Sequence, residues 1–480
     1  MKTLLLNPPS FEQFDGGAGS RYPARREIHS FWYPTWLAYP AGLIPDSRLL
    51  DAPSHGVKPE ETVRIATGYD FVVFFTSTAG FQSDIRLAEE MKTAKPALKI
   101  AFVGPHVTVL AEESLNSSWA IDFIVRKEFD YAVAEFALGK DVGEIAGISF
   151  QKNGQVFHNP DRPLIEDLDS LPFVVEVFKR DLDINKYNIP FLHHPYLSFY
   201  TSRGCPALCT FCLWPQTMCS HRWRIRSSDN VVAEVRQALE LFPQNKEIFF
   251  DDDTFTIMKS RVLDLCKRMK PLKFTWSCNA RVTTDFETLK AMREAGCRLL
   301  IVGFESGDPA ILKNIRKGAT IEQAVAFMKN CRRLGFKVHG DFQMGLPGET
   351  QETIEKTVRF AVKLDPDTIQ VSMSHPYPGT VLFRYLKDQG YFTSEAMTDE
   401  HGYQLPSFEY PHLSRREILK AVEDFYGRYY FRPRIIFRIV GRALFSGSER
   451  RRLYHEGKEF LKLRVRRKNF IHSGETDRRR

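Results

Sequence analysis

The feature that most constrains the fold is a regular alternation of short apolar runs with amphipathic helical patterns, which occurs twice along the 480 residues. Such runs predict buried strands, and the helical periodicity between them predicts helices that cover a parallel sheet. The first series ends near residue 145, and the second begins at Tyr196. The sequence therefore predicts an α/β protein with two successive β/α domains.

Residues 1–145 predict a doubly wound, Rossmann-like domain, because polar and glycine-rich turns follow its strands. The expected strands are Thr3–Leu6, Arg48–Asp51, Phe71–Thr76, Lys99–Val103 and Asp122–Val125, with helices such as Ser83–Lys95 and Phe129–Leu138. Residues 146–195 predict a hairpin that turns at Asn153-Gly154, followed by a Pro-rich linker with little periodicity.

Residues 196–413 predict a partial (β/α)6 barrel, whose active site would lie at the carboxyl ends of its strands. The six expected strands are Leu197–Thr201, Glu247–Asp251, Lys273–Cys278, Leu299–Phe304, Lys337–Met344 and Thr368–Met373. Side chains that directly follow each strand are therefore the first candidates for a functional site.

Residues 414–480 predict a helical, basic tail. Residues 428–480 hold 17 Lys and Arg against 5 Asp and Glu, so +12 of charge lies here and the rest of the chain carries −4. Arg434, Arg438 and Arg442 share one helix face, and the apolar face consists of Ile435, Ile436, Ile439, Val440 and Leu444. The pattern is typical of a helix on an anionic membrane, and equally of one whose apolar face packs on the protein.

Composition narrows the class of protein further. An apolar fraction of 43% excludes a disordered chain, no apolar run is long enough to span a membrane, and the first residues do not resemble a signal peptide. We therefore expect a cytoplasmic protein. The basic runs Arg450–Arg452 and Arg464–Lys468 occur without a recognisable nucleic-acid-binding fold, so no nucleic-acid partner is predicted.

The strongest chemical signal is the C-x3-C-x2-C motif of Cys205, Cys209 and Cys212, directly after the first barrel strand. Three thiolates on one short loop can hold three irons of a [4Fe–4S] cluster and leave the fourth iron open. The alternatives are a zinc site or a four-ligand ferredoxin centre completed by Cys219 or His221. Zinc sites usually carry a second cysteine pair, which is missing here. The other cysteines, Cys266, Cys278, Cys297 and Cys331, lie singly and are expected in the core.

This motif, with the aromatic Phe211 before its last cysteine, resembles that of the radical S-adenosylmethionine (SAM) superfamily. Further matches follow successive strands: FFDDDTF (Phe249–Phe255), NARV (Asn279–Val282), GFESG (Gly303–Gly307) and HGDFQMGLPGET (His339–Thr350). The resemblance implies that SAM is bound by Phe211, Asp252, Arg281, Glu305, Ser306 and Gln343. Taken alone, each match has a structural explanation, such as a helix cap, a turn, or a pair between Glu305 and Arg281.

The implied activity is reductive cleavage of SAM to a 5′-deoxyadenosyl radical, with a one-electron reductase, flavodoxin or ferredoxin as donor. An Fe–S electron carrier or a zinc-binding module is the alternative of another class. The sequence names no acid or base, although several polar side chains lie near strand ends or the domain junction: His193, His194, His339, His375 and Tyr377.

The N-terminal domain resembles that of the cobalamin-binding subclass, which implies cobalamin contacts at Asp51, Ser77 and Gly104. Where that subclass has a GEGE-like run, this chain has Lys127–Asp130. A cobalt-ligating D-x-H-x-x-G motif is broken, because Pro53 occupies the ligand position and His55 follows two residues later. We therefore expect cobalamin without a protein histidine ligand, or a domain that keeps the fold without the cofactor. Gly16–Gly19 predicts a flexible loop, since it lacks the context of a dinucleotide fingerprint.

Over its whole length, and particularly across its first 53 residues, the chain also resembles the radical SAM proteins of hopanoid biosynthesis, of the bacteriohopanetetrol cyclitol ether synthase type. That resemblance implies a hopanoid lipid substrate and contraction of an attached amino-sugar ring to a cyclitol ether. The alternative within the class is a cobalamin-dependent radical methyltransferase acting on an unactivated carbon of a lipid. A membrane-resident substrate would suit a basic tail that rests on an anionic membrane surface.

Overall fold

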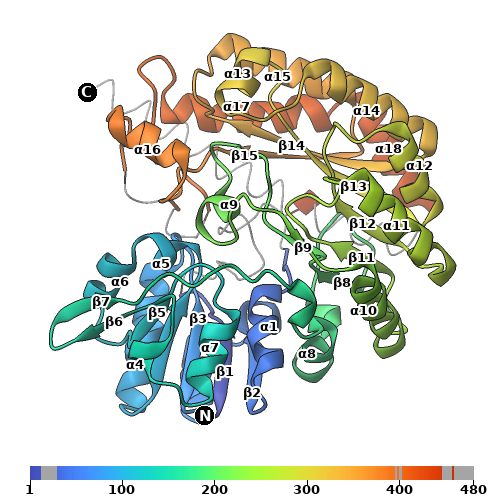
Figure 1. Ribbon diagram of the computed structural model, residues 1–480. Helices are drawn as coiled ribbons and strands as arrows, with labels where there is room; N and C mark the ends of the chain where they lie inside the picture. Colours follow the sequence, from blue (N-terminus) through green and yellow to red (C-terminus); the bar gives the residue numbers. More distant parts are fainter. Residues whose placement is uncertain (12–29, 395–396, 399–402, 446–456, 459–480) are drawn as a thin grey trace.

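The computed structural model describes residues 1–11, 30–394, 397–398, 403–445 and 457–458 (Figure 1). Two α/β units lie one below the other in this view, with the N-terminal sheet at the bottom and the second unit, carrying most of the helices, at the top. The glycine-rich segment Gly16–Gly19 lies outside the described residues. No described helix is long and apolar enough to cross a membrane.

The first sheet has seven strands in the order β2-β1-β3-β4-β5-β6-β7. The strands are β1 Thr3–Asn7, β2 Ser47–Asp51, β3 Phe71–Phe75, β4 Lys99–Val103, β5 Phe123–Val125, β6 Ile148–Lys152 and β7 Gln155–His158. The first five pair in parallel, as a doubly wound domain requires. The predicted hairpin is β6–β7, and because β6 pairs antiparallel with β5 it extends this sheet instead of lying between the domains.

Helices cover the two faces of the first sheet, and separate apolar clusters fill the space on either side of it. They are α1 Thr35–Leu43, α2 Ala52–His55, α3 Pro59–Ala66, α4 Phe81–Ala94, α5 Pro105–Val109, α6 Ala111–Ser117 and α7 Asp130–Ala137. The segment predicted as an unstructured linker contains a further helix, α8 Val174–Asp181. This helix has only eight residues, VVEVFKRD, which is too short a segment to establish a 3.6-residue period.

The second sheet has six parallel strands in the order β15-β14-β13-β12-β11-β8, so the predicted partial barrel is confirmed. These strands are β8 Tyr196–Phe199, β11 Glu247–Phe250, β12 Trp276–Asn279, β13 Cys297–Glu305, β14 Lys337–Met344 and β15 Thr368–Met373. The helices between them are α10 Ser228–Leu241, α11 Lys259–Met269, α12 Phe286–Glu294, α13 Pro309–Asn314, α14 Ile321–Leu334 and α15 Gln351–Leu364. A short ribbon of β9 Ser202–Arg203 and β10 Arg224–Ile225 precedes α10, and α9 Leu213–Thr217 and α16 Val381–Asp388 complete the described elements of this unit.

The described part of the helical tail forms two helices, α17 Arg415–Tyr430 and α18 Pro433–Phe445. Proline cannot continue a helix from the preceding turn, so Pro433 starts a new one. The arginine face of α18 turns toward the protein. Arg434 and Arg438 turn toward Asp365, with contacts of 3.3 and 2.9 Å. Of the predicted apolar face, Ile435 is buried while Ile436 and Val440 are exposed.

Buried ion pairs join the two units. Arg203 donates to both oxygens of Asp130 at 2.8 and 2.9 Å, and Arg224 donates to both oxygens of Glu128 at 2.7 and 2.8 Å. The Arg203 guanidinium also lies 4.4 Å from the ring of Trp36. The run Lys127–Asp130 therefore uses its carboxylates to hold the barrel against the first domain, immediately beside the cysteine loop.

Candidate functional site

The three motif cysteines line one cavity of about 190 Å³ at the carboxyl ends of the barrel strands. Cys205 and Cys209 are buried, and Cys212 is half-buried. The loop begins at Gly204, where φ is 86° and a side chain would come within 2.3 Å of the Arg222 carbonyl oxygen. Only glycine fits this turn, and it directs the chain so that three thiols three and four residues apart face the same space.

This donor set fits a cluster better than a single ion. Among the described residues, no three Cys, His, Asp or Glu side chains come close enough to hold one metal ion, as zinc would require. The suggested fourth ligands are turned elsewhere, because the Cys219 thiol lies 3.5 Å from an Asp253 oxygen and a His221 ring nitrogen lies 3.0 Å from the Cys205 carbonyl oxygen. Neither residue lines the cavity, so the loop presents three thiols.

A charged group faces the thiols across the cavity. One Glu305 oxygen is 2.7 Å from the Lys317 ammonium, and the other accepts from the Gln343 amide at 2.9 Å. Burial alone would lower the pKa of Lys317, but the Glu305 carboxylate raises it above its ordinary value. Arg281 donates to the Lys317 carbonyl oxygen at 2.7 Å. The partner of Glu305 is thus Lys317 and not Arg281.

Two of the predicted SAM contacts, Gln343 and Ser306, do not line the cavity themselves. Gln343 is buried and orients Glu305, while Ser306 is fully buried and contacts the Thr357 hydroxyl at 3.1 Å. Glu305 itself has a φ of 63°, a left-handed conformation that re-aims the residues after β13. Phe211 and Arg281 do line the cavity.

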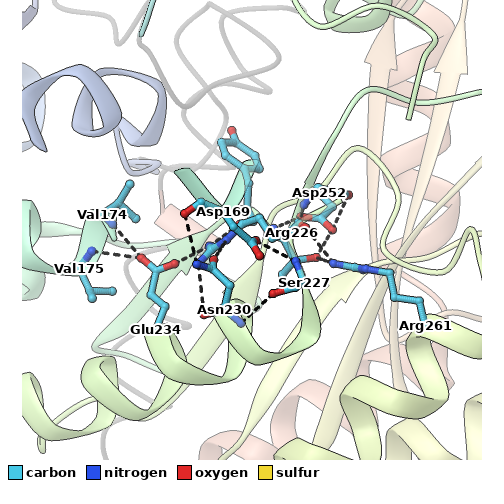
Figure 2. Close-up of polar contacts among 12 residues, drawn as sticks. Asp169, Val174, Val175, Arg226, Ser227, Asn230, Glu234, Asp252 and Arg261 are labelled. Carbon is cyan, nitrogen blue, oxygen red and sulfur yellow. Dashed lines mark hydrogen bonds and ion pairs between the residues drawn. The ribbon is translucent and has the colours of Figure 1, made fainter. Parts of the chain in front are cut away.

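Asp252, a predicted SAM contact, is fully buried and does not line the cavity. Its two oxygens accept hydrogen bonds from the backbone N–H and hydroxyl groups of Thr201 and Ser202. Figure 2 shows this carboxylate within a polar network in which Arg261 also contacts Thr201, at 2.8 and 3.0 Å. The adjacent Asp253 and Thr254 line the cavity instead.

The residues expected to contact cobalamin lie at the carboxyl edge of the first sheet. Asp51 is buried and accepts from Asn7 and Tyr187, at 2.7 Å each. Ser77 is also buried and accepts from the Gly80 N–H at 3.3 Å. Gly104 has a φ of 117° and lies against Thr76, where a side chain would approach the carbonyl oxygen to 2.3 Å. The side chains of Asp51 and Ser77 thus bond to other groups of the protein, and Gly104 allows close contact between neighbouring segments at this edge of the sheet.

His55 is engaged on both ring nitrogens. One lies 2.9 Å from the Asp51 carbonyl oxygen, and the other accepts from the Asp183 N–H at 3.1 Å. This agrees with cobalamin bound without a histidine from the broken motif. Trp32, which lies just before α1 in the first domain, lines the cysteine cavity, and its ring packs on Phe249 of the barrel.

Comparison with known proteins identifies the two units. Residues 199–361 match the radical SAM superfamily, and residues 23–137 match the B12 binding domain. An uncharacterized methyltransferase of Pyrococcus horikoshii is 31% identical over 92% of this chain and 95% of its own. This chain belongs to the radical SAM enzymes that carry a B12-binding domain. The hopanoid C-2 methylase of Rhodopseudomonas palustris is 23% identical over 81% of this chain and 71% of its own.

The fold agrees with this family. The structure of the radical SAM methyltransferase TsrM from Kitasatospora setae, with cobalamin and a [4Fe–4S] cluster bound, superimposes with a TM-score of 0.66. The match covers 96% of this chain and 99% of that one at 14% identity. The radical SAM and B12-binding domains together imply that the cofactors are a [4Fe–4S] cluster, SAM and cobalamin. The cluster supplies the electron for SAM cleavage and cobalamin can carry a methyl group, while the chain positions both and excludes water.

Proposed function

We propose that the enzyme transfers a methyl group to an unactivated carbon of a lipid substrate. The observation that carries this proposal is the shared cavity: thiols from the barrel loop and Trp32 from the B12-binding domain line the same space. A radical formed beside the cysteines would thus arise next to the domain that binds cobalamin. Methyltransferases recur among the relatives.

The residues of this chain have distinct tasks in such a reaction. Cys205, Cys209 and Cys212 hold the cluster, and Glu305 with Lys317 forms a fixed ion pair opposite them. A buried pair of this kind offers a directed acceptor and donor without reorganisation during the reaction. The interdomain pairs of Arg203 and Arg224 keep the distance between the two cofactor-binding units constant.

The lipid substrate is part of the proposal, and the hopanoid methylase supports it. The described part of α18 adds a surface that suits a membrane-bound substrate. Ile436, Phe437 and Val440 lie on one side of this helix and are 43%, 75% and 47% exposed. We propose that this apolar side, with the basic residues of the tail, rests on the anionic cytoplasmic face of the membrane. A flavodoxin or ferredoxin would supply the electron.

Product analysis tests the proposal directly. The enzyme is reconstituted anaerobically with iron, sulfide and cobalamin, and then incubated with methyl-deuterated SAM, dithionite and a hopanoid extract. Methyl transfer predicts equal amounts of S-adenosylhomocysteine and 5′-deoxyadenosine, with a deuterated methyl group on the lipid. Ring contraction predicts 5′-deoxyadenosine alone and a product with no added carbon, and that result would contradict the proposal.

Cys209→Ala provides the control. Loss of one of three thiolates should remove the visible absorption of the cluster and all SAM cleavage, because the two remaining ligands cannot retain it. Cys331→Ala is the matched substitution, since this cysteine is buried in the core away from the cavity and should keep both signals. SAM cleavage that survives in Cys209→Ala would contradict the assignment of the loop.

A further inference from the structure

The cavity continues from the cysteines down into the barrel, and its deep end is polar. His339, Asp341 and Gln343 alternate along β14, so they share the inward face of this strand. Gln343 lies at the carboxyl end beside Glu305, and His339 precedes it by four residues, which is about 13 Å of strand. His339, Asp341 and the neighbouring Gln370 of β15 all line the cavity.

Barrel interiors are normally filled by Val, Ile and Leu, so this polar end calls for a physical reason. Asp341 pairs with Gln370 in the strand register, and His339 pairs with Thr368. These four side chains form two adjacent polar rungs across β14 and β15. Three of them, His339, Asp341 and Gln370, line the cavity, together with the apolar Ile301.

One buried nitrogen in this cluster has no hydrogen-bond partner among the described residues. His339 is 5% exposed; its Nδ1 lies 2.7 Å from the Thr368 hydroxyl, which fixes the ring. Its Nε2 is 3.3 Å from an Asp341 oxygen but lacks hydrogen-bond geometry to it. Buried polar groups are nearly always paired, but this nitrogen is itself buried against Asp341. The ring therefore contributes a fixed polar edge beside Asp341 in the wall of the cavity.

The other groups define the ligand's chemistry. Asp341 offers carboxylate oxygens that only accept hydrogen bonds, and its side chain is 31% exposed. The Gln370 amide nitrogen donates to Ser372 at 3.1 Å, which leaves the amide oxygen as an acceptor toward the cavity. Phe191 stacks on His339 with 4.1 Å between the ring centres and provides an apolar wall. An acceptor-rich pocket with an aromatic wall suits a ligand rich in O–H and N–H donors.

We propose that His339, Asp341 and Gln370 form the binding site for a hydroxyl- or amine-bearing group of the substrate. This inference deepens the proposed function, on which it rests, by assigning the polar end of the substrate to the deep end of the cavity. The carboxylate of Asp341 selects neutral or cationic groups and repels carboxylates and phosphates. The carbon that reacts would then lie nearer the cysteines, at the opposite end.

Equilibrium dialysis of the reconstituted enzyme against radiolabelled D-glucosamine tests this site without any turnover. A fragment of this size is expected to bind one per chain with a Kd of about 1–10 mM. D-Gluconate has a similar size but a negative charge and should not compete. A fragment that binds specifically should saturate its site well below about 100 mM. The absence of saturable binding up to that concentration would overturn the proposal.

Variants locate the binding. Asp341→Leu and Gln370→Leu should each weaken D-glucosamine binding about tenfold or more, because each removes a hydrogen-bond acceptor from the wall of the cavity. Asp46→Asn, an exposed carboxylate on the first domain, is the matched control and should bind as the wild type does. Visible absorption of the cluster verifies that each variant is folded around its loop. Unchanged binding in both cavity variants would refute the site, whereas failure of SAM cleavage would refute only the proposed function.

Discussion

Asp252 gives the sharpest test of how the structure changes the sequence-based interpretation. The resemblance assigns it to SAM, but the structure buries it completely and directs its oxygens to Thr201 and Ser202. Its Oδ1 accepts two backbone N–H groups, and its Oδ2 accepts two hydroxyls. Because these residues lead directly into the cysteine loop, we expect Asp252 to fix the start of that loop.

The expected cost of Asp252→Ala follows from these bonds. Two buried backbone N–H groups lose their acceptor, at about 1–3 kcal/mol each, while the hydroxyls can rotate to other partners. The loss of about 2–6 kcal/mol should lower the apparent Tm by roughly 5 °C or more. Asp252→Asn keeps an oxygen toward the N–H groups and places its amide against the hydroxyls, which can accept. It should therefore cost less than half as much, with a remaining loss because the charge beside buried Arg261 disappears.

Thermal unfolding and SAM binding together decide the matter. Asp252→Asn should retain its cluster and bind SAM within about twofold of the wild type, since a twofold change is only ~0.4 kcal/mol. Asp253→Asn is the matched variant, because its side chain lines the cavity; it should weaken SAM binding with little change in Tm. A folded Asp252→Asn protein with native Tm and at least tenfold weaker SAM binding would refute the structural role.

Three other perturbations have defined outcomes. Arg203→Met leaves the buried Asp130 carboxylate without its guanidinium partner, so the free energy of unfolding should fall by about 3–5 kcal/mol. This should appear as a lower Tm, and adding Asp130→Leu to the same protein should partly restore it. Gly104→Ala puts a methyl group 2.3 Å from the Thr76 carbonyl oxygen and should lower Tm by several degrees, while a native Tm would show that this contact relaxes freely. Burial raises the pKa of Glu349 to about 8, against bonds from the Gly345 and Leu346 N–H groups that lower it. In the folded protein Glu349 thus keeps its proton up to about pH 8, whereas in the unfolded chain it loses it near pH 4.5. The contribution of Glu349 to the free energy of unfolding is therefore fully present below pH 4.5 and is lost as the pH rises to about 8. When Tm is measured as a function of pH, the Glu349→Gln variant should lack the decline expected of the wild type. Parallel Tm profiles for the two proteins would contradict this assignment.

Local patterns were sufficient for much of the fold and the chemistry. Short apolar runs predicted every strand of the two parallel series to within a few residues, because most residues of these strands are buried. The cysteine motif is equally local. Three thiols on one loop are placed together by a short stretch of chain, so the sequence alone predicted that they share one cavity.

The contacts of the three aspartates after β11, and the partner of Glu305, depended on the tertiary structure. Asp251, Asp252 and Asp253 are equivalent as sequence, and only the pairing of β8 with β11 decides which one bonds the loop and which faces the cavity. Lys317 follows a short helix without any motif, yet the barrel brings it to Glu305.

The tail shows the same limit. Its amphipathic pattern is real, but Asp365, in a distant turn, attracts the arginines and so turns the apolar side outward. Sequence alone determined which residues share a strand, helix or loop, because those relations depend on near neighbours. The partners across the barrel, between the domains and beneath the tail depend on contacts between residues far apart in the chain, which only the folded structure specifies.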